Sequence, residues 1–242
     1  MSTEDRSRYL PARRALADEV YDAVLGLLMD QVIEPGSRAS IDGIARQLDV
    51  SPTPVREALA RLESEGLVIK KALKGYTAAP LLDAEGLRQL FEMRGLLEPA
   101  AARLATPRLP QDALEELQRI FDAMHARGES ERSADEHYQD YRDFAERDAQ
   151  FHALIARHAG NDLLSDAILR LRSHMHIYRL YFTHGLTKET SDEHEAVLVA
   201  IQSGDGDAAA TAMLAHIERS YARMAASLSE PAPDSAAPTG AG

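Results

Sequence analysis

Four side chains in the second half of the sequence have the chemistry of a metal site. Asp148 and His152 are four residues apart in ERDAQFHALIARHAG, so both project from one face of a helix. His194 and His216 lie on two later helical segments, and both can approach that pair if these segments run antiparallel. One carboxylate and three imidazoles suit a divalent ion such as zinc, nickel or manganese. The spacing fits equally well an Asp–His hydrogen-bonded pair beside unrelated helical histidines.

The elements that must carry these ligands are helices. Ala, Leu, Glu and Arg dominate the chain after Pro80, and amphipathic patterns recur over 83–105, 110–127, 136–158, 162–183, 188–203 and 206–228. Short breaks at Pro and Gly separate them, which favours antiparallel neighbours in a bundle. The predicted fold class is therefore mainly α, with an antiparallel all-helical bundle at the C-terminal end.

A different pattern occupies the segment from Pro35 to Ala79. Two short apolar helix faces follow one another, the first capped by Ser40 and the second ended by Gly66. For the second helix the N-cap is either Ser51 or Thr53, with a slight preference for Thr53, because a Pro at N3 offers no N–H to Ser51. Strand-like runs then flank the basic turn KKALKG, as in a hairpin. This order of elements predicts an N-terminal winged helix-turn-helix.

The polar face of the second helix predicts contact with duplex DNA. A helix N-terminus presents free N–H groups to phosphates, and an Arg near it can reach a guanine edge or a phosphate. The hairpin would contact the backbone beside it. The predicted DNA-binding residues are Ser51, Thr53, Arg56, Lys70, Lys74 and Gly75. The alternative from the pattern alone is a small helical unit that docks on protein, with its basic side chains solvated.

Charge is distributed unevenly along the 242 residues, which carry a net charge of −12. The chain to Pro80 has 11 basic and 12 acidic residues, whereas the remainder has 16 and 27. Between Pro52 and Gly75 there are five basic and three acidic residues, so the proposed reading face is locally positive. DNA binding made mostly through phosphates is expected to depend steeply on salt.

Composition limits the remaining possibilities. The chain has no Cys, which excludes disulfides, thiolate metal sites and a Cys nucleophile. No stretch approaches the ~20 apolar residues of a membrane span and the N-terminus is not signal-like, so a cytoplasmic protein is expected. The expected organisation is a disordered N-terminus over 1–10, a DNA-binding domain over 11–80, a helical effector and metal domain over 81–229, and a disordered tail over 230–242.

The run IARQLDVSPTPVREALARLESEGLV with the basic turn after it resembles the DNA-binding domain of GntR-family bacterial transcription regulators. Two departures are visible: Pro52 and Asp42 stand where relatives carry base-contacting Arg residues. The family's usual operator preference is therefore not carried over. The segments FEMRGLLEPAAARLA, DAQFH, GN and DEH, with His216, are similar to the FCD ligand domain of the FadR-like branch.

This resemblance implies a homodimeric, metabolite-responsive regulator, most simply a repressor. It places the metal ligands on Asp148, His152, His194 and His216, and effector binding on Arg94 and Asn161, with Arg94 pairing to a small carboxylate. Glu98 matches a recurring position and is equally compatible with a structural role. Two alternatives remain from the residues: a metal sensor without an organic effector, and a metal-dependent enzyme acting on small acids. No second acid or base at a defined spacing supports the enzyme.

Overall fold

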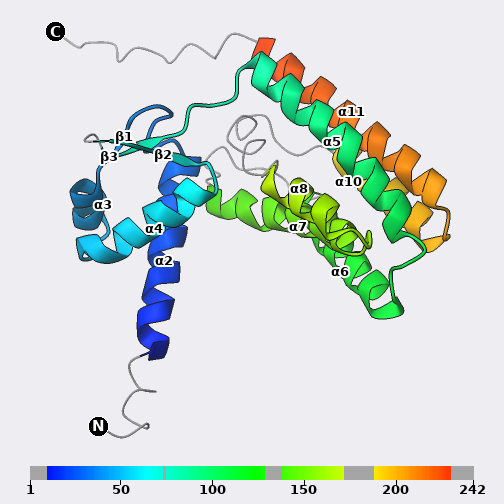
Figure 1. Cartoon of the computed structure of the whole chain (residues 1–242), viewed down its shortest axis with the longest axis horizontal. Helices are drawn as coiled ribbons and strands as arrows, with labels where there is room; N and C mark the ends of the chain where they lie inside the picture. Colours follow the sequence, from blue (N-terminus) through cyan, green and yellow to red (C-terminus); the bar gives the residue numbers. More distant parts are fainter. Residues whose placement is uncertain (1–9, 73–74, 129–137, 172–187, 230–242) are drawn as a thin grey trace, which may run out of the picture.

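The structure is a computed structural model that describes residues 10–72, 75–128, 138–171 and 188–229. It is mainly helical, with a small N-terminal unit joined to a larger helical unit (Figure 1). The fold class predicted from sequence is confirmed. Lys74, most of the expected disordered segments at both ends, and the histidines at 137, 174, 176 and 184 lie outside the described residues.

The N-terminal unit is a winged helix. It consists of α2 (Leu10–Met29), β1 (Arg38–Ala39), α3 (Ile41–Gln47), α4 (Pro52–Ser64), β2 (Val68–Lys71) and β3 (Gly75–Ala78). The strands form an antiparallel sheet in the order β1-β3-β2, with Arg38 opposite Thr77 and Lys70 opposite Tyr76. The sequence did not predict β1, because two residues are too few to show an alternating pattern.

The ends of α3 and α4 follow from local chemistry. Ser40 accepts a hydrogen bond from the Gly43 N–H at 3.2 Å, as its cap position predicts. The N-cap of α4 is Ser51, so the preference for Thr53 was wrong. Ser51 makes no side-chain cap bond, and Pro54 removes one of the N–H groups that it would normally bind. Gly66 ends this region at φ +76°, a conformation that favours glycine.

The C-terminal unit is a bundle built from six described helices. These are α5 (Ala84–Ala105), α6 (Gln111–Gly128), α7 (Tyr138–Arg157), α8 (Asp162–Arg170), α10 (Lys188–Gln202) and α11 (Gly206–Ser229). Helices α5, α10 and α11 lie side by side, and α6 packs against α7 (Figure 1). Helix α8 ends at Arg170, where the Leu171 N–H bonds the Ile168 carbonyl, and residues 172–183 of the helix predicted over 162–183 lie outside the described residues.

Each unit has its own hydrophobic core. The winged-helix core gathers the apolar faces of α2, α3 and α4 around Leu28, Leu59 and Leu62, which are fully buried. The bundle core contains Leu117, Phe151 and Leu198 among others. The two units meet where α7 packs against α2, and Ala145 on α7 contacts the winged-helix core. No described helix is long and apolar enough to cross a membrane.

Candidate metal centre

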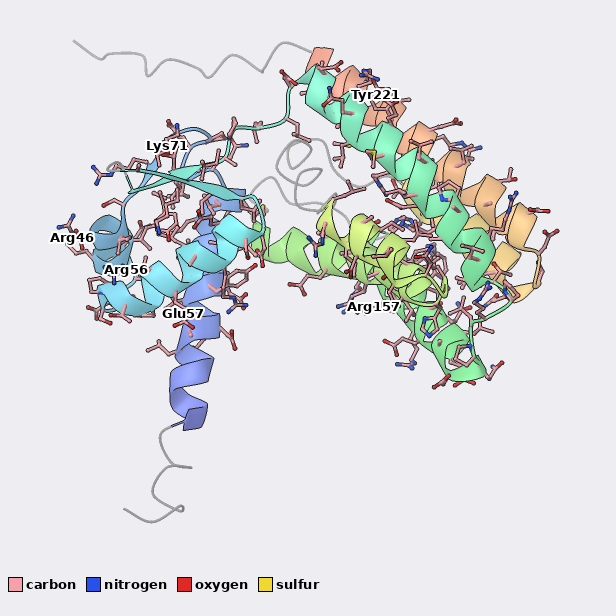
Figure 2. The ribbon with its side chains drawn as sticks, viewed as in Figure 1. Arg46, Arg56, Glu57, Lys71, Arg157 and Tyr221 are labelled. Atoms are coloured by element: carbon pink, nitrogen blue, oxygen red, sulfur yellow. The ribbon has the colours of Figure 1, made fainter. Side chains whose placement is uncertain are left out.

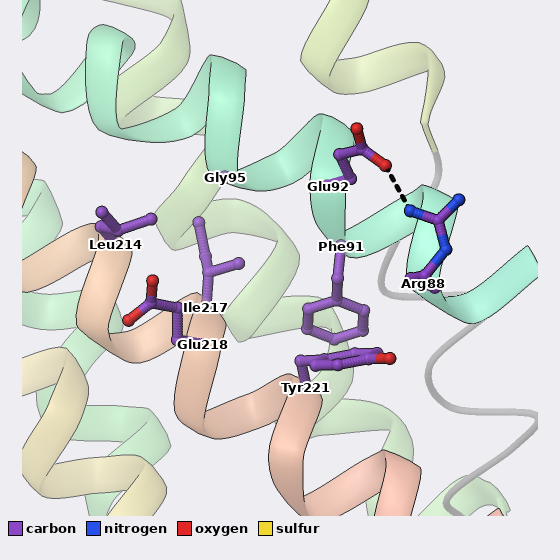
Figure 3. Close-up of a pocket in the computed structure, with 8 residues that line it drawn as sticks. All are labelled: Arg88, Phe91, Glu92, Gly95, Leu214, Ile217, Glu218 and Tyr221. Carbon is purple, nitrogen blue, oxygen red and sulfur yellow. Dashed lines mark hydrogen bonds and ion pairs between the residues drawn. The ribbon is translucent and has the colours of Figure 1, made fainter. Parts of the chain in front are cut away.

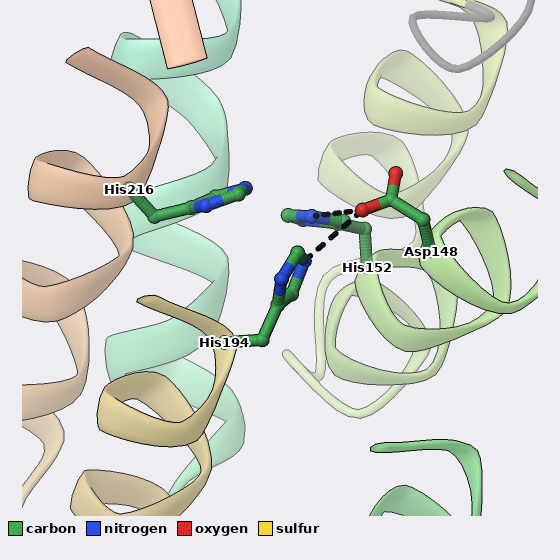
Figure 4. A group of neighbouring side chains, drawn as sticks. All are labelled: Asp148, His152, His194 and His216. Atoms are coloured by element: carbon green, nitrogen blue, oxygen red, sulfur yellow. Dashed lines mark ion pairs between the residues drawn. The ribbon is translucent and has the colours of Figure 1, made fainter. Parts of the chain in front are cut away.

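The bundle brings the four predicted ligands together. Asp148 and His152 project from α7, His194 from α10 and His216 from α11, as Figure 4 shows. Each residue offers one ligand atom, and these four atoms all lie within 4.8 Å of one another. The three imidazoles are buried, whereas the side chain of Asp148 is 22% exposed. Sequence reasoning therefore identified a group that tertiary packing assembles.

Each imidazole is held through its Nδ1 atom. The Nδ1 of His152 lies 2.8 Å from Oε2 of Glu98, a short contact whose N–H direction is imperfectly aligned with the oxygen. The Nδ1 of His194 donates to the Thr190 carbonyl at 2.8 Å, and that of His216 lies 3.1 Å from Oε2 of Glu193. All three Nδ1 atoms lie near acceptors, and a ring that is protonated on Nδ1 alone carries its lone pair on Nε2. Such outer partners commonly orient metal-binding histidines.

The contact between Asp148 and His194 tests whether a cation fits here. The Nε2 of His194 lies 3.0 Å from Oδ1 of Asp148, while its Nδ1 is already the donor to a carbonyl. A bare Nε2 and a carboxylate oxygen are both acceptors, so a second proton or a cation must lie between them. The Nε2 atoms of His152 and His194 are also buried without an aligned hydrogen-bond partner. These orphaned atoms fit a divalent metal.

The dimensions agree with this interpretation. Ligands held about 2.1 Å from an ion lie at most about 4.2 Å apart. The observed group needs only a small inward movement to reach that size. Three imidazoles with one carboxylate suit zinc, nickel or manganese, and an ion with more than four positions has room for a further ligand.

The electrostatics favour the protonation states that a metal requires. Burial and the neighbouring His194, His152 and Arg94 charges lower the pKa of His216 from 6.5 to about 3, against the opposing bond from Glu193. Burial alone would raise the pKa of Asp148, but the His194 imidazole beside it and the other two imidazoles hold it well below its usual value. The carboxylate is thus ionised and the His216 ring neutral at ordinary pH.

Arg94 lies beside the cluster and is itself buried, with 3% of its side chain exposed. Its Nε is 2.7 Å from Oε1 of Glu98 and its Nη2 is 3.3 Å from Oε2. Burial would lower the pKa of Arg94, but the charge of Glu98 raises it, so the guanidinium stays charged. Among the described residues, Nη1 of Arg94 has no hydrogen-bond partner. This leaves one side of the forked guanidinium group for a ligand.

Asn161 has a structural role that the sequence did not predict. It is the N-cap of α8, and its side-chain oxygen accepts from the Leu164 N–H at 3.1 Å. The residue is exposed, and its oxygen is already used. Only its amide nitrogen remains for an effector, so its expected role as an effector contact stays a prediction.

The other predicted residues form the outer face of the winged helix. Ser51, Thr53 and Arg56 are exposed at the start of α4, and Lys70 is exposed on the wing. Figure 2 shows Arg46 on α3 and Arg56 on α4 at the outer end of this unit, with Lys71 on the wing. Gly75 opens β3 at φ +79°, which a turn in the left-handed region requires. Arg61 is also exposed, but it binds Asp18 of α2 at 2.7 Å.

A separate cavity of about 310 Å³ lies between α5 and α11 (Figure 3). None of the four cluster residues lines it. Phe91 and Tyr221 form one wall with ring centroids 5.5 Å apart, and Arg88 binds Glu92 at 2.7 Å at its edge. Its walls are mostly apolar, with Arg88, Glu92 and Glu218 as the charged residues, and none of the lining residues is a histidine.

Two functional carboxylates were missed or left undecided by sequence reasoning. Glu193 holds His216 and is itself bound by Arg223 at 2.7 and 2.9 Å. Despite burial, Arg223 and His216 lower the pKa of Glu193 to about 2. Glu98 plays the same part for His152. The position of Glu193 next to His194 in DEH was the available signal, but adjacent residues on a helix face different directions.

The winged helix and the metal-compatible bundle together define a class, the DNA-binding transcription regulators with a helical ligand domain. Residues 16–77 match the bacterial regulatory proteins of the gntR family, and residues 89–219 match the FCD domain. The chain belongs to the GntR family and carries its FCD domain. The relatives are regulators, so the enzyme alternative is not supported.

Individual relatives agree with this assignment. The HTH-type transcriptional regulator LutR of Bacillus subtilis is 31% identical over 76% of this chain and 90% of its own length. A putative L-lactate dehydrogenase operon regulatory protein of Escherichia coli is 27% identical over 87% of both chains. Among solved structures, E. coli McbR/YncC has a TM-score of 0.67 at 21% identity, covering 86% of this chain and 96% of its own. That structural likeness shows the fold.

Proposed function

We propose that this regulator binds its operator as a homodimer and releases it when a small carboxylate binds beside a divalent metal in the bundle. The observation that carries the proposal is the acceptor pair of Asp148 and His194, which calls for a cation, next to the partly free fork of Arg94. When bound, the ion supplies open coordination positions for an anionic oxygen. Arg94 binds the other end of that carboxylate and Asp148, with the three imidazoles, holds the ion.

The names of relatives indicate the direction of regulation and suggest which compounds to test first. One is a probable D-xylose utilization operon transcriptional repressor, which supports repression here. Another is described as a putative L-lactate dehydrogenase operon regulatory protein, so L-lactate belongs early in a carboxylate screen. A two-fold dimer would present two α4 helices to two half-sites of a roughly palindromic operator.

Transmission to DNA requires that the effector favour one arrangement of the two units over another. Helix α7 supplies Asp148 and His152, and one turn earlier its Ala145 packs against the winged-helix core. Helix α5 carries Arg94 and follows the winged helix directly in the chain. Closing the site around a ligand draws on both helices, so we expect α7 and α5 together to reorient the winged helix.

The test begins with an operator selected from random duplexes by the purified, metal-loaded protein. Small carboxylates are then screened for release of this operator by fluorescence anisotropy. Release by a carboxylate in the wild type and its loss in Arg94→Lys supports the proposal, because Lys keeps the charge but lacks the two-pronged geometry. If chelation changes operator binding while no carboxylate does, the protein is a metal sensor instead. Operator release that persists in Arg94→Lys contradicts the assigned role of Arg94.

A further inference from the structure

The buried carboxylate of Glu98 touches both halves of the proposed effector site. Its Oε2 lies 2.8 Å from Nδ1 of His152 and 3.3 Å from Nη2 of Arg94, and its Oε1 lies 2.7 Å from Nε of Arg94. The side chain is 4% exposed, so water does not screen these contacts. Glu98 thus joins a proposed metal ligand to the proposed effector-binding residue.

We propose that Glu98 is a positioning residue that couples metal binding to carboxylate binding. The inference rests on the proposed function, and it names a path, in addition to direct coordination, by which the two ligands affect one another. Glu98 fills the Nε side of the Arg94 fork, so an arriving carboxylate must bind on the Nη1 side. The Arg94 charge is then shared between two carboxylates, and Glu98 interacts more strongly with the N–H of His152. A stronger acceptor at Nδ1 makes Nε2 a better metal ligand.

The coupling must be reciprocal, since it is a free energy shared by two binding events. A carboxylate at Arg94 tightens metal binding, and the metal tightens carboxylate binding by the same factor. The charge of Glu98 is the essential feature. The guanidinium of Arg94 lies 2.7 Å from one Glu98 oxygen and 3.3 Å from the other, which favours the carboxylate form.

Glu193 provides a matched control within the same cluster. It also holds a metal-binding imidazole, through Nδ1 of His216, and it also binds an arginine at 2.7 Å. That arginine is Arg223, whose side chain is 23% exposed, and not Arg94. Glu193 therefore orients a proposed ligand without touching the effector residue. Changing Glu193 tests the loss of orientation alone, whereas changing Glu98 tests orientation and coupling together.

The experiment measures Zn²⁺ affinity by competition with a coloured chelator. Each measurement is made once in sodium acetate and once in sodium chloride at equal ionic strength. Wild type, Glu98→Gln and Glu193→Gln are compared, and thermal unfolding checks that each is folded. We expect both variants to bind Zn²⁺ about 10- to 100-fold more weakly, as for other outer partners of metal ligands. Acetate should tighten Zn²⁺ binding by a similar factor in the wild type and in Glu193→Gln, and by a clearly smaller factor in Glu98→Gln, where only direct coordination of acetate to the ion remains.

Each of the other possible results contradicts one specific part of the proposal. Tightening by acetate that is undiminished in Glu98→Gln, or that is absent from a wild type that binds Zn²⁺, removes the coupling through Glu98 and leaves the metal site intact. A wild type that does not bind Zn²⁺ removes the proposed metal function itself. If Glu98→Gln does not fold, Glu98→Asp replaces it: the shorter side chain keeps the charge but cannot reach Arg94 and His152 together, so the effect of acetate should again be smaller than in the wild type.

Discussion

Nε2 of His194 lies 3.0 Å from Oδ1 of Asp148, although the other nitrogen of the ring already donates to the Thr190 carbonyl. Two acceptors this close are unfavourable in a partly desolvated site unless positive charge lies between them. In the same cluster, the outer partners of all three imidazoles leave Nε2 facing inward. This relationship is the main support for the proposed metal site, and it leads to experiments on both units of the chain.

Metal content is the first prediction. Purified and dialysed wild-type protein should contain about one equivalent of zinc, nickel or manganese by elemental analysis, and His152→Ala should contain almost none. Removing one ligand of four lowers affinity because the remaining set cannot enclose the ion. His158→Ala is the control, since its Nδ1 lies 2.9 Å from the Leu154 carbonyl in the same helix region and it is outside the cluster. Equal metal in the two variants would place the ion elsewhere.

Stability should depend on the metal. A ligand that binds only the folded state adds about 2.7 kcal/mol at 100 times its dissociation constant. We therefore expect a chelator to lower the melting temperature of the wild type by several degrees. Asp148→Asn, which removes the carboxylate charge from the cluster, should melt at the same temperature with and without chelator. A wild type indifferent to both added Zn²⁺ and chelator would count against a bound ion.

The metal-free protein should lose stability as the pH falls from about 6.5 toward 3. The pKa of His216 is lowered to about 3 in the fold from an ordinary value of 6.5, because of its burial and cationic neighbours. In this window the unfolded chain binds a proton that the folded chain does not, so the free energy of unfolding decreases. Urea unfolding in chelator across this range measures the slope, and His216→Gln should flatten it. An unchanged slope in the variant would assign the effect to the carboxylates.

Arg56 should contribute directly to DNA binding. Its side chain is exposed on α4 and has no described partner, unlike Arg61, which is bound to Asp18. If Arg56 contacts a phosphate, Arg56→Ala should weaken binding to all DNA sequences equally and lower the slope of log affinity against log salt concentration by about one. If Arg56 contacts a base, the substitution should cost about 1–3 kcal/mol of binding free energy and relax specificity at one operator position. Arg157→Ala is the matched control, because it removes the same charge from an exposed site at the end of α7. Equal effects would assign the loss to net charge.

The contact between α7 and the winged helix should affect signalling more than metal binding. Ala145 packs against the winged-helix core, so Ala145→Leu overpacks this contact, with a typical cost of about 1–3 kcal/mol. We expect normal metal content but a reduced response of operator binding to carboxylates. Gln150→Leu is the comparison, since that residue is exposed on the same helix. A normal response in Ala145→Leu would shift the transmission path to α5.

The amino-acid sequence by itself determined the local features. The period of apolar residues set α3 and α4, Ser40 capped its helix as expected, and the four candidate ligand residues were identifiable by type and spacing. These features depend on residues within a few positions of one another, where helix geometry relates spacing to direction. The family followed from the same short segments, and the comparisons confirmed it.

Tertiary structure decided the contacts between residues that lie far apart in the sequence. Only the packed structure shows that Glu98 of α5 contacts His152 of α7 and that Glu193 of α10 contacts His216 and Arg223 of α11. Only the structure shows that the side-chain oxygen of Asn161 caps α8. The two-residue strand β1 exists because β3 lies beside it. The physical reason is that each of these contacts joins residues from different elements, whose approach is fixed by the burial of two apolar cores rather than by local spacing.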